Sequence, residues 1–278
     1  MSHADHAAIH PTAVVSPAAR LGEGVRVGPF VVIEGEVSIG AGTILRPYVH
    51  LIGPLTIGAN NEVGTGTVIG AAPQHLGYKG EPTSVVIGDG NIFREYVTVH
   101  RGMPAGSGPG RGVTRVGDRN LFMVGSHVAH DCVIGNECIL ANSAVIGGHV
   151  EVGDRALLSG NSAVHQFCRV GRLGLLSGAS ATSKDIPPFW VMQGVNTVCG
   201  VNTVGMRRAG MDAAEIQAVR RAFNMLYREK LPIPVALMRI EAELGASAAV
   251  REIVQFIRSS KRGICGPHRV RYPADDAA

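Results

Sequence analysis

The chain has 278 residues, of which 45% are hydrophobic and 17% charged, and this composition excludes a largely disordered protein. Aromatic residues make up only 5% while glycine occurs 37 times, which excludes a conventional core of Phe, Tyr and Trp packed between helices and sheets. A formal net charge of +4 is too small to indicate a nucleic-acid partner.

The sequence predicts a cytoplasmic protein. Its five cysteines are odd in number and form no CxxC pair, which favours a reducing compartment. The N-terminal residues lack the basic segment and apolar run of a signal peptide, and no stretch approaches the roughly 18 apolar residues of a membrane-spanning helix. We therefore expect no integral membrane segment.

The dominant pattern is an aliphatic or aromatic side chain at every sixth position. The register runs from Ile9 to Ile69, returns from Ile87 to Val99 and, after a slip of one residue, continues from Val116 to Leu176. All 25 of these positions are apolar, and glycine often follows them. A period of six fits neither an amphipathic helix nor a simple hairpin. It predicts short strands joined by tight corners, three strands to a coil of 18 residues, with stacked aliphatic side chains forming the core.

Two domains are expected, a parallel β-helix over residues 1–190 and a helical domain over 191–278. Residues 71–84 and 102–114 interrupt the repeat and are rich in Gly and Pro, so we expect them to leave the β-helix as loops. The first carries polar side chains suited to a ligand. The second is interpreted as a mobile flap or packing arm, and an inert insertion is the alternative for both.

The helical domain is predicted from capping and periodicity. Asp212 with Glu215 indicates the start of a helix whose apolar residues run to Leu226. Further helices are expected near 235–244 and 248–260, and the residues from Gly266 are expected to be frayed. Such a domain would cover the strand edges at the end of the β-helix.

A coil of 18 residues converts sequence spacing into stacking. His130, Gly148 and Gln166 should share one column, with Asp131 and His149 in the next. Histidine accepts a proton near neutral pH, a carboxylate can orient it, and glycine leaves its N–H open to a developing oxyanion. The pattern therefore predicts a general base and an oxyanion donor, and hence acyl transfer to a hydroxyl. The histidines could instead be ordinary surface residues, or could bind zinc between subunits.

Several motifs carry a resemblance to a known family. They are SHVAHDC, CILAN, GGHV, AVHQFC, YKGEPT, VTVHRG, DIPPF and GVNTVGMRR. Over about residues 9 to 262 the chain resembles the UDP-N-acetylglucosamine O-acyltransferases, hexapeptide-repeat enzymes of the first step of lipid A synthesis. The resemblance implies a left-handed parallel β-helix with a C-terminal α-helical domain; the spacing alone does not decide the hand.

The same resemblance implies the reaction and its partners. A (3R)-3-hydroxyacyl group would pass from acyl carrier protein to the 3-hydroxyl of UDP-N-acetylglucosamine, in a homotrimer with sites between subunits. No cofactor or metal is expected. The implied acidic partner would be received by basic residues of the helical domain, unless these are only a solvated helix face: Arg207, Arg220, Arg221 and Arg228.

The resemblance also implies roles for single residues. His130 matches the general base, Asp131 its partner and Gly148 the oxyanion donor, while Gly178 matches an acyl-length ruler at which glycine leaves room for a longer chain. The residues expected to contact substrate are His75, Tyr78, His127, His149, His165, Gln166, Asn202 and Arg208.

The chain departs from the family pattern at four positions. His75 and Gly77 stand where the family often has Asp and Lys, and Val204 and Ala209 where Glu and Arg are frequent. A 3-amino sugar nucleotide therefore stays open as acceptor. The alternatives are an N-acyltransferase of the same pathway, a zinc hydratase like the γ-class carbonic anhydrases, and a catalytically silent β-helical scaffold.

Overall fold

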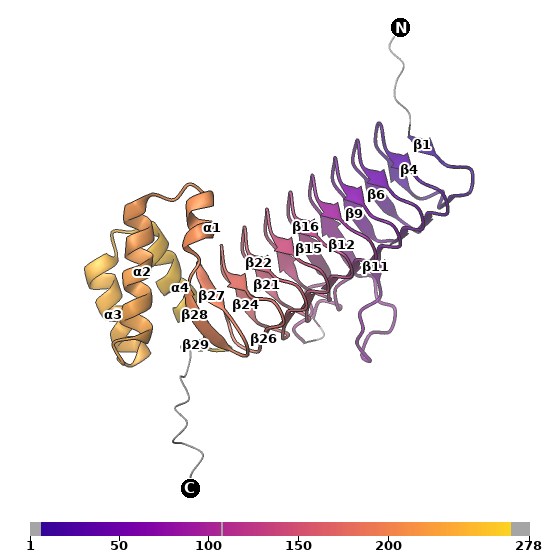
Figure 1. Cartoon of the computed structure of the whole chain (residues 1–278). Coiled ribbons are helices and arrows are strands. Elements are labelled where there is room, and N and C mark those ends of the chain that lie inside the picture. Colours follow the sequence, from indigo (N-terminus) through magenta and orange to yellow (C-terminus); the bar gives the residue numbers. More distant parts are fainter. Residues whose placement is uncertain (1–6, 107, 268–278) are drawn as a thin grey trace, which may run out of the picture.

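The computed structural model describes residues 7–106 and 108–267, and it folds as a left-handed parallel β-helix followed by a bundle of helices (Figure 1). The strands form three sheets, which are the three faces of a triangular prism. Each coil contributes one strand to each face. The predicted fold class is confirmed.

The strands fall into the three faces as follows. The first face holds β1 (Ala8–Ile9), β4 (Arg26–Val27), β7 (Ile44–Leu45), β10 (Glu62–Val63), β13 (Ile92–Phe93), β16 (Leu121–Phe122), β19 (Ile139–Leu140), β22 (Leu157–Leu158), β25 (Leu175–Leu176), β27 (Trp190–Met192), β28 (Thr197–Val201) and β29 (Gly266–Pro267). The second face holds β2 (Val14–Val15), β5 (Val32–Glu34), β8 (His50–Ile52), β11 (Val68–Ala71), β14 (Thr98–His100), β17 (His127–Val128), β20 (Val145–Ile146), β23 (Ala163–Val164) and β26 (Ala181–Thr182). The third face holds β3 (Arg20–Leu21), β6 (Val37–Ile39), β9 (Leu55–Ile57), β12 (Ser84–Ile87), β15 (Val113–Val116), β18 (Val133–Ile134), β21 (Glu151–Val152) and β24 (Arg169–Val170).

The strand register confirms the six-residue repeat. Phe122 pairs with Leu140, which is 18 residues further along the chain. Across the two insertions the offset grows to 30, from Val63 to Phe93, and to 29, from Phe93 to Phe122. The insertions therefore lengthen two coils without changing which residues stack.

The repeated aliphatic side chains form the core, as predicted. From Val27 onward each repeat position is at most 4% exposed. The exception is the first coil, where Ile9 is 48% exposed because this coil lies at the end of the stack. Full burial of one such side chain contributes about 1.5–3 kcal/mol, so stacking supplies much of the stability.

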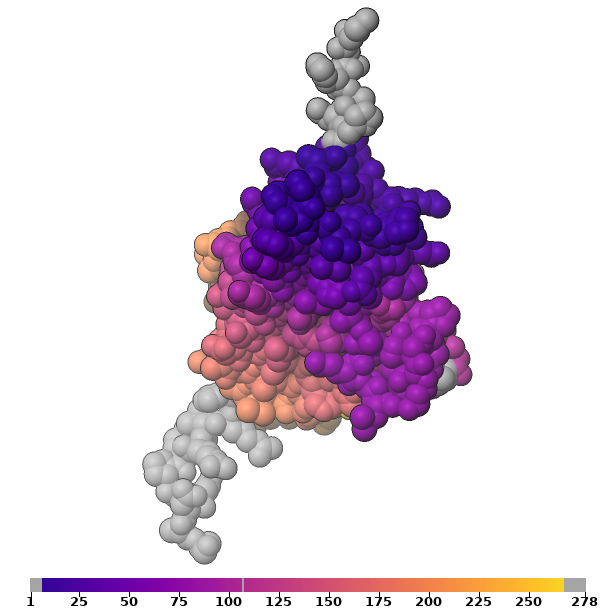
Figure 2. Space-filling model, turned by 90° about the vertical axis from the view of Figure 1, so that its right-hand side faces the viewer, coloured from indigo at the N-terminus to yellow at the C-terminus, as the bar shows by residue number. Residues whose placement is uncertain are grey.

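Both loops leave the prism at one corner, in consecutive coils. The first joins β11 to β12 and the second joins β14 to β15, so each connects the second face to the third. Figure 2 shows them, violet to magenta, projecting from one side of the molecule. The next three coils turn the same corner at residues 129–132, 147–150 and 165–168, which we call the histidine corner.

Up to residue 267, where the described part of the chain ends, four helices follow the prism: α1 (Thr203–Arg208), α2 (Ala213–Tyr227), α3 (Ile233–Leu244) and α4 (Ala248–Arg258). The three predicted helices are confirmed, and so is the N-cap, because Asp212 Oδ1 accepts a hydrogen bond from the Glu215 amide at 2.7 Å. The buried Trp190 ring lies 5.0 Å from that of Tyr227 and 5.7 Å from that of Phe223, which packs α2 on the last coil.

The C-terminal prediction was partly wrong. Gly266 and Pro267 are not frayed but form β29, which pairs with β28. The rest of that expectation concerns residues 268–278, which lie outside the described residues. None of the described helices is long and apolar enough to cross a membrane.

Candidate active site

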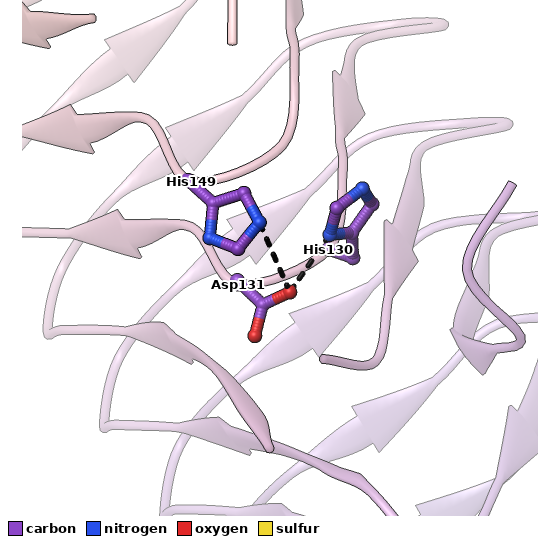
Figure 3. A group of neighbouring side chains, drawn as sticks. All are labelled: His130, Asp131 and His149. Atoms are coloured by element: carbon purple, nitrogen blue, oxygen red, sulfur yellow. Dashed lines mark hydrogen bonds and ion pairs between the residues drawn. The ribbon is translucent and has the colours of Figure 1, made fainter. Parts of the chain in front are cut away.

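His130 and Asp131 form a hydrogen-bonded pair at the histidine corner. Nδ1 of His130 lies 2.7 Å from Oδ2 of Asp131 (Figure 3), so the Nδ1–H group donates a hydrogen bond to the carboxylate. The Asp131 side chain is fully buried and that of His130 is 11% exposed. Nε2, the other ring nitrogen, is left with its lone pair free to accept a proton.

The second loop holds the Asp131 carboxylate from the other side. Oδ2 accepts the Met103 amide at 2.9 Å and Oδ1 accepts the Arg111 amide at 2.7 Å. Burial by itself would raise the pKa of Asp131, but the hydrogen bonds from His130, Met103 and Arg111 outweigh it, and the net shift of the pKa is downward. Asp131 is therefore ionised at neutral pH.

Gly148 lies directly over the His130 ring. The successive coils stack here as predicted, since the His149 amide donates a hydrogen bond to the His130 carbonyl at 3.0 Å. A Cβ on Gly148 would stand 2.5 Å from Cε1 and 2.6 Å from Nε2 of His130, so only glycine leaves the ring in place. Among the hydrogen bonds of the described residues, the Gly148 N–H has no acceptor. A ring with a free proton acceptor is thus in direct contact with a residue whose N–H is unbonded.

The neighbouring imidazoles are kept neutral by burial. His149 stacks on Phe167 at 4.5 Å between ring centroids, and burial lowers its pKa although Asp131, 3.7 Å away, opposes this. Burial, followed by the proximity of His130, lowers the pKa of His127, whose Nδ1 lies 2.7 Å from Thr98 Oγ1. Burial and the other histidines also lower the pKa of His100 to about 4. Neutral rings of this kind can exchange hydrogen bonds with hydroxyl groups of a ligand.

A cavity of about 450 Å³ opens onto His130. It gathers five of the polar residues predicted from the sequence: His75, His127, His130, His165 and Gln166. A neighbouring cavity of about 490 Å³ lies on the other side of His149 and is bounded by Arg111, Arg169 and Arg262. Within the described chain Arg262 links the two, because its guanidinium lies 3.3 Å from His165 Nδ1.

Other predicted residues lie away from this cavity in the single chain. The Tyr78 hydroxyl bonds within the first loop, where it donates a hydrogen bond to the Glu81 carbonyl at 2.6 Å. Asn202 caps α1 and donates to the Leu173 carbonyl at 2.9 Å, at the corner between the third and first faces. Arg208 ends α1, and Gly178 lies at the corner between the first and second faces.

Two cavity residues were missed as candidates. His100 lies 8% exposed under the histidine corner, with its ring 4.9 Å from that of His127. The register could have found it, because the offset of 29 across the second insertion stacks Val99 under Val128 and so brings His100 to this corner. Gln74 comes from the first loop, where no repeat predicts position.

Three side chains could be considered as metal ligands: His130, Asp131 and His149 have donor atoms within 4.8 Å of one another. Their chemistry does not fit a zinc site. Two tetrahedral ligands at about 2.1 Å from zinc would stand about 3.4 Å apart, whereas Nδ1 of His130 and Oδ2 of Asp131 are separated by only 2.7 Å. Each oxygen of the carboxylate is also already bonded to a loop amide.

Comparison with known proteins agrees with this geometry. A family model described as bacterial transferase hexapeptide (six repeats) matches residues 114–148, and one described as UDP N-acetylglucosamine O-acyltransferase, domain 2, matches residues 185–265. The acyl-(acyl-carrier-protein)–UDP-N-acetylglucosamine O-acyltransferase of Halorhodospira halophila is 47% identical over 92% of this chain and 98% of its own. Its namesake from Stenotrophomonas maltophilia is 45% identical over 91% of this chain and 96% of its own.

Solved structures of the same family are also similar to this chain. LpxA, a UDP-N-acetylglucosamine acyltransferase from Bacteroides fragilis, has a TM-score of 0.88 and 41% identity, covering 92% of this chain and 99% of its own. The Francisella novicida UDP-N-acetylglucosamine acyltransferase has a TM-score of 0.89 and 37% identity, covering 93% and 94%. A β-helix of six-residue repeats with a histidine–aspartate pair at one corner defines a hexapeptide-repeat transferase. Within that class, the chain belongs to the UDP-N-acetylglucosamine O-acyltransferase family.

Proposed function

We propose that this protein transfers a (3R)-3-hydroxyacyl group from acyl carrier protein to the 3-hydroxyl of UDP-N-acetylglucosamine, the first step of lipid A synthesis. The observation that carries this proposal is that His130 and Gly148, whose N–H is unbonded, are in contact and line one cavity. Family membership supplies the donor and the acceptor.

The reaction follows from these groups. His130 Nε2 takes the proton of the sugar hydroxyl as its oxygen attacks the thioester carbonyl, and Gly148 N–H donates to the oxyanion that forms. When the intermediate collapses, the C–S bond breaks and the departing thiolate takes the proton from Nε2. Asp131 stabilises the imidazolium between these steps. A positioned base contributes about 10²–10⁴-fold and an oxyanion donor about 3–4 kcal/mol.

A homotrimer is supported by the outward side chains of the prism. From β13 to β25 the first face presents an unbroken aliphatic stripe: Ile92, Leu121, Ile139, Leu157 and Leu175. The second face is mostly apolar, with His50, Thr98 and His127 among its outward residues, and it presents Val14, Val32, Val68, Val145 and Ala163. The third face presents charges, such as Arg115, Glu151 and Arg169. Packing the first face of one copy on the second face of the next covers both apolar faces and leaves the charged face in water.

This packing supports a site shared between subunits. It brings the corner between the third and first faces of one copy beside the histidine corner of its neighbour. Asn202 lies at the former corner, with Arg208 at the end of the same short helix. Both residues would then reach the nucleotide bound at the neighbour's His130. Gly178 lies across the second face from His130, where it would limit the acyl chain.

The helical domain offers a surface for the acidic carrier protein. Arg220 and Arg228 border a hollow of about 290 Å³ on α2, and in the described chain neither has a carboxylate partner. Arg221, in contrast, is paired with Glu243 at 3.2 Å. A cytoplasmic location suits such a partner, and the five cysteines are free, four of them buried.

Replacement of His130 by Ala tests the proposal. Purified protein is incubated with UDP-N-acetylglucosamine and a panel of 3-hydroxyacyl carrier proteins, and products are identified by mass. We expect O-acylation by the wild type and a loss of about 10²–10⁴-fold in the variant, with the oligomer intact. A wild type that acylates no sugar nucleotide, or a variant with near-normal rates, would overturn the assignment. Stoichiometric zinc in active protein would favour a hydratase.

A further inference from the structure

The second loop does more than extend a coil. Residues 101–112, which we call the dyad loop, run from β14 to β15 and bring two backbone amides to one buried carboxylate. Asp131 Oδ2 accepts from His130 and Met103, and Oδ1 accepts from Arg111. Both loop contacts are made by the main chain, at 2.9 and 2.7 Å.

Hydrogen bonds and an ion pair fix the dyad loop where its two ends meet. The Gly112 amide donates to the Met103 carbonyl at 2.8 Å, and the Ser84 amide donates to the Gly112 carbonyl at 2.9 Å. The Arg111 side chain pairs with Glu151 on β21 at 2.5 Å. These contacts join the two amide donors to the coils on either side, so the donors are held in place before substrate arrives.

Two histidines lie close enough to Asp131 to be its hydrogen-bond partner. Its Oδ2 lies 2.7 Å from His130 Nδ1 and 3.7 Å from His149 Nε2, and the two rings stand nearly perpendicular with centroids 5.1 Å apart (Figure 3). A small rotation of the carboxylate would exchange one partner for the other. The loop amides oppose this rotation, because each oxygen would have to leave an N–H donor in a buried site.

We propose that the dyad loop is a positioning element: the N–H groups of Met103 and Arg111 fix the Asp131 carboxylate so that it pairs with His130 and not with His149. The loop thereby selects which imidazole serves as the base. The inference rests on the proposed acyl transfer, for which His130 is the base.

The charged and titratable groups around Asp131 are few. They are His130, His149, the Arg111 side chain with its partner Glu151, and the Cys132 thiol. Burial raises the pKa of Cys132 to about 12, so this thiol is uncharged at neutral pH. The two loop amides are therefore the donors whose removal changes the hydrogen bonding of Asp131 without removing an ionisable group.

Proline substitution removes an amide donor, and because its ring Cδ takes the place of the N–H, the loop must also withdraw from the carboxylate at that point. Met103→Pro and Arg111→Pro each delete one N–H, and each follows a glycine, Gly102 or Gly110, which tolerates the constraint that proline sets on its predecessor. Met103→Ala and Arg111→Ala are the matched controls, because they remove the same side chains and keep the amides. The half-exposed Arg111–Glu151 pair is lost in both Arg111→Pro and Arg111→Ala, so its contribution cancels in the comparison.

We expect each proline variant to lose about 10–100-fold in kcat relative to its alanine control, with KM for UDP-N-acetylglucosamine unchanged. In an Asp131→Asn background the proline substitution should cost far less, because the carboxylate that the amides position has been removed.

Three results would overturn the inference while leaving the function in place. These are equal kcat for the proline and alanine variants, a change confined to KM, and full additivity with Asp131→Asn. A wild type without acyl transfer would instead remove the proposed function. Thermal unfolding identifies a variant that does not fold, in which case the other proline position carries the test.

Discussion

Gly148 leaves the space beside the His130 imidazole free of any side chain, and a substitution can test whether activity requires this. In Gly148→Ala the added methyl would stand 2.5 Å from Cε1 of His130, so the ring must turn away from its position between Asp131 and the cavity. The amide N–H is retained. We expect kcat to fall by about 10²-fold or more, because a displacement of about 1 Å at the reacting atoms has that effect.

A matched control is available in the same repeat. At Gly160 the nearest atom to an added Cβ is the Asn142 carbonyl oxygen at 3.4 Å, so Gly160→Ala meets little resistance. Steady-state kinetics and thermal unfolding should be compared for both variants. Near-normal kcat in Gly148→Ala would show that the His130 position is not critical.

His100 makes the stability of the protein depend on pH. Its folded-state pKa is lowered to about 4 from 6.5, chiefly by burial. Above about pH 6.5 neither state is protonated at this residue. As the pH falls from 6.5 towards 4, His100 becomes protonated in the unfolded chain but stays neutral in the folded chain. The free energy of unfolding should therefore decrease by about 1–3 kcal/mol over this range.

Urea unfolding at a series of pH values measures this effect. His100→Gln should unfold with a shallower dependence on pH between 7 and 4 than the wild type. Parallel curves for the wild type and His100→Gln would mean that His100 is protonated equally in both states.

At the scale of elements, a column of buried asparagines joins three coils. Asn61 Oδ1 accepts both the amide and the side-chain N–H of Asn91, at 2.8 and 3.0 Å. Asn91 Oδ1 repeats the pattern with Asn120, at 2.9 and 3.0 Å. Each asparagine thus satisfies the corner of the next coil, including the coils lengthened by the insertions.

Asn91→Ala should interrupt this column. It leaves the buried Asn120 amide without its side-chain acceptor, which costs about 1–3 kcal/mol. Denaturant unfolding should report that loss, while Asn224→Ala on the exposed surface of α2 should change stability by no more than about 0.5 kcal/mol. An unchanged midpoint for Asn91→Ala would indicate that water replaces the lost acceptor.

The repeat explains why so much of the fold could be predicted. A buried aliphatic at every sixth residue fixes both the core and the stacking, so the neighbourhood of His130 and Gly148 followed from spacing alone. The role of the dyad loop could not, because its contacts to Asp131 come from backbone amides that any residue but proline supplies. The helix α1 was also missed. This helix has only six residues, and its N-cap residue, Asn202, was interpreted from the family resemblance as a contact to the nucleotide.

At the scale of the whole molecule, the proposed site between subunits would allow inactive subunits to complement each other. In the proposed packing, His130→Ala and Arg208→Ala place their defects on opposite sides of the same interface. In a trimer refolded from an equal mixture, about one site in four has an intact His130 from one subunit and an intact Arg208 from its neighbour.

We therefore expect about a quarter of wild-type activity to return on mixing, provided that the single variants are both inactive. Size-exclusion chromatography with light scattering should show trimers before and after mixing. No recovery from well-formed mixed trimers would indicate that each site is complete within one subunit.

The two insertions have a consequence for how acceptor preference can change. Each leaves and re-enters the prism between strands that stay in register, as the pairs Val63–Phe93 and Phe93–Phe122 show. A spliced segment of different length or chemistry can thus be accommodated while the scaffold beneath is undisturbed. Exchange of the first loop for that of a relative with another sugar preference is accordingly a modular route to new specificity, whereas any exchange of the dyad loop has to preserve its two amide contacts to Asp131.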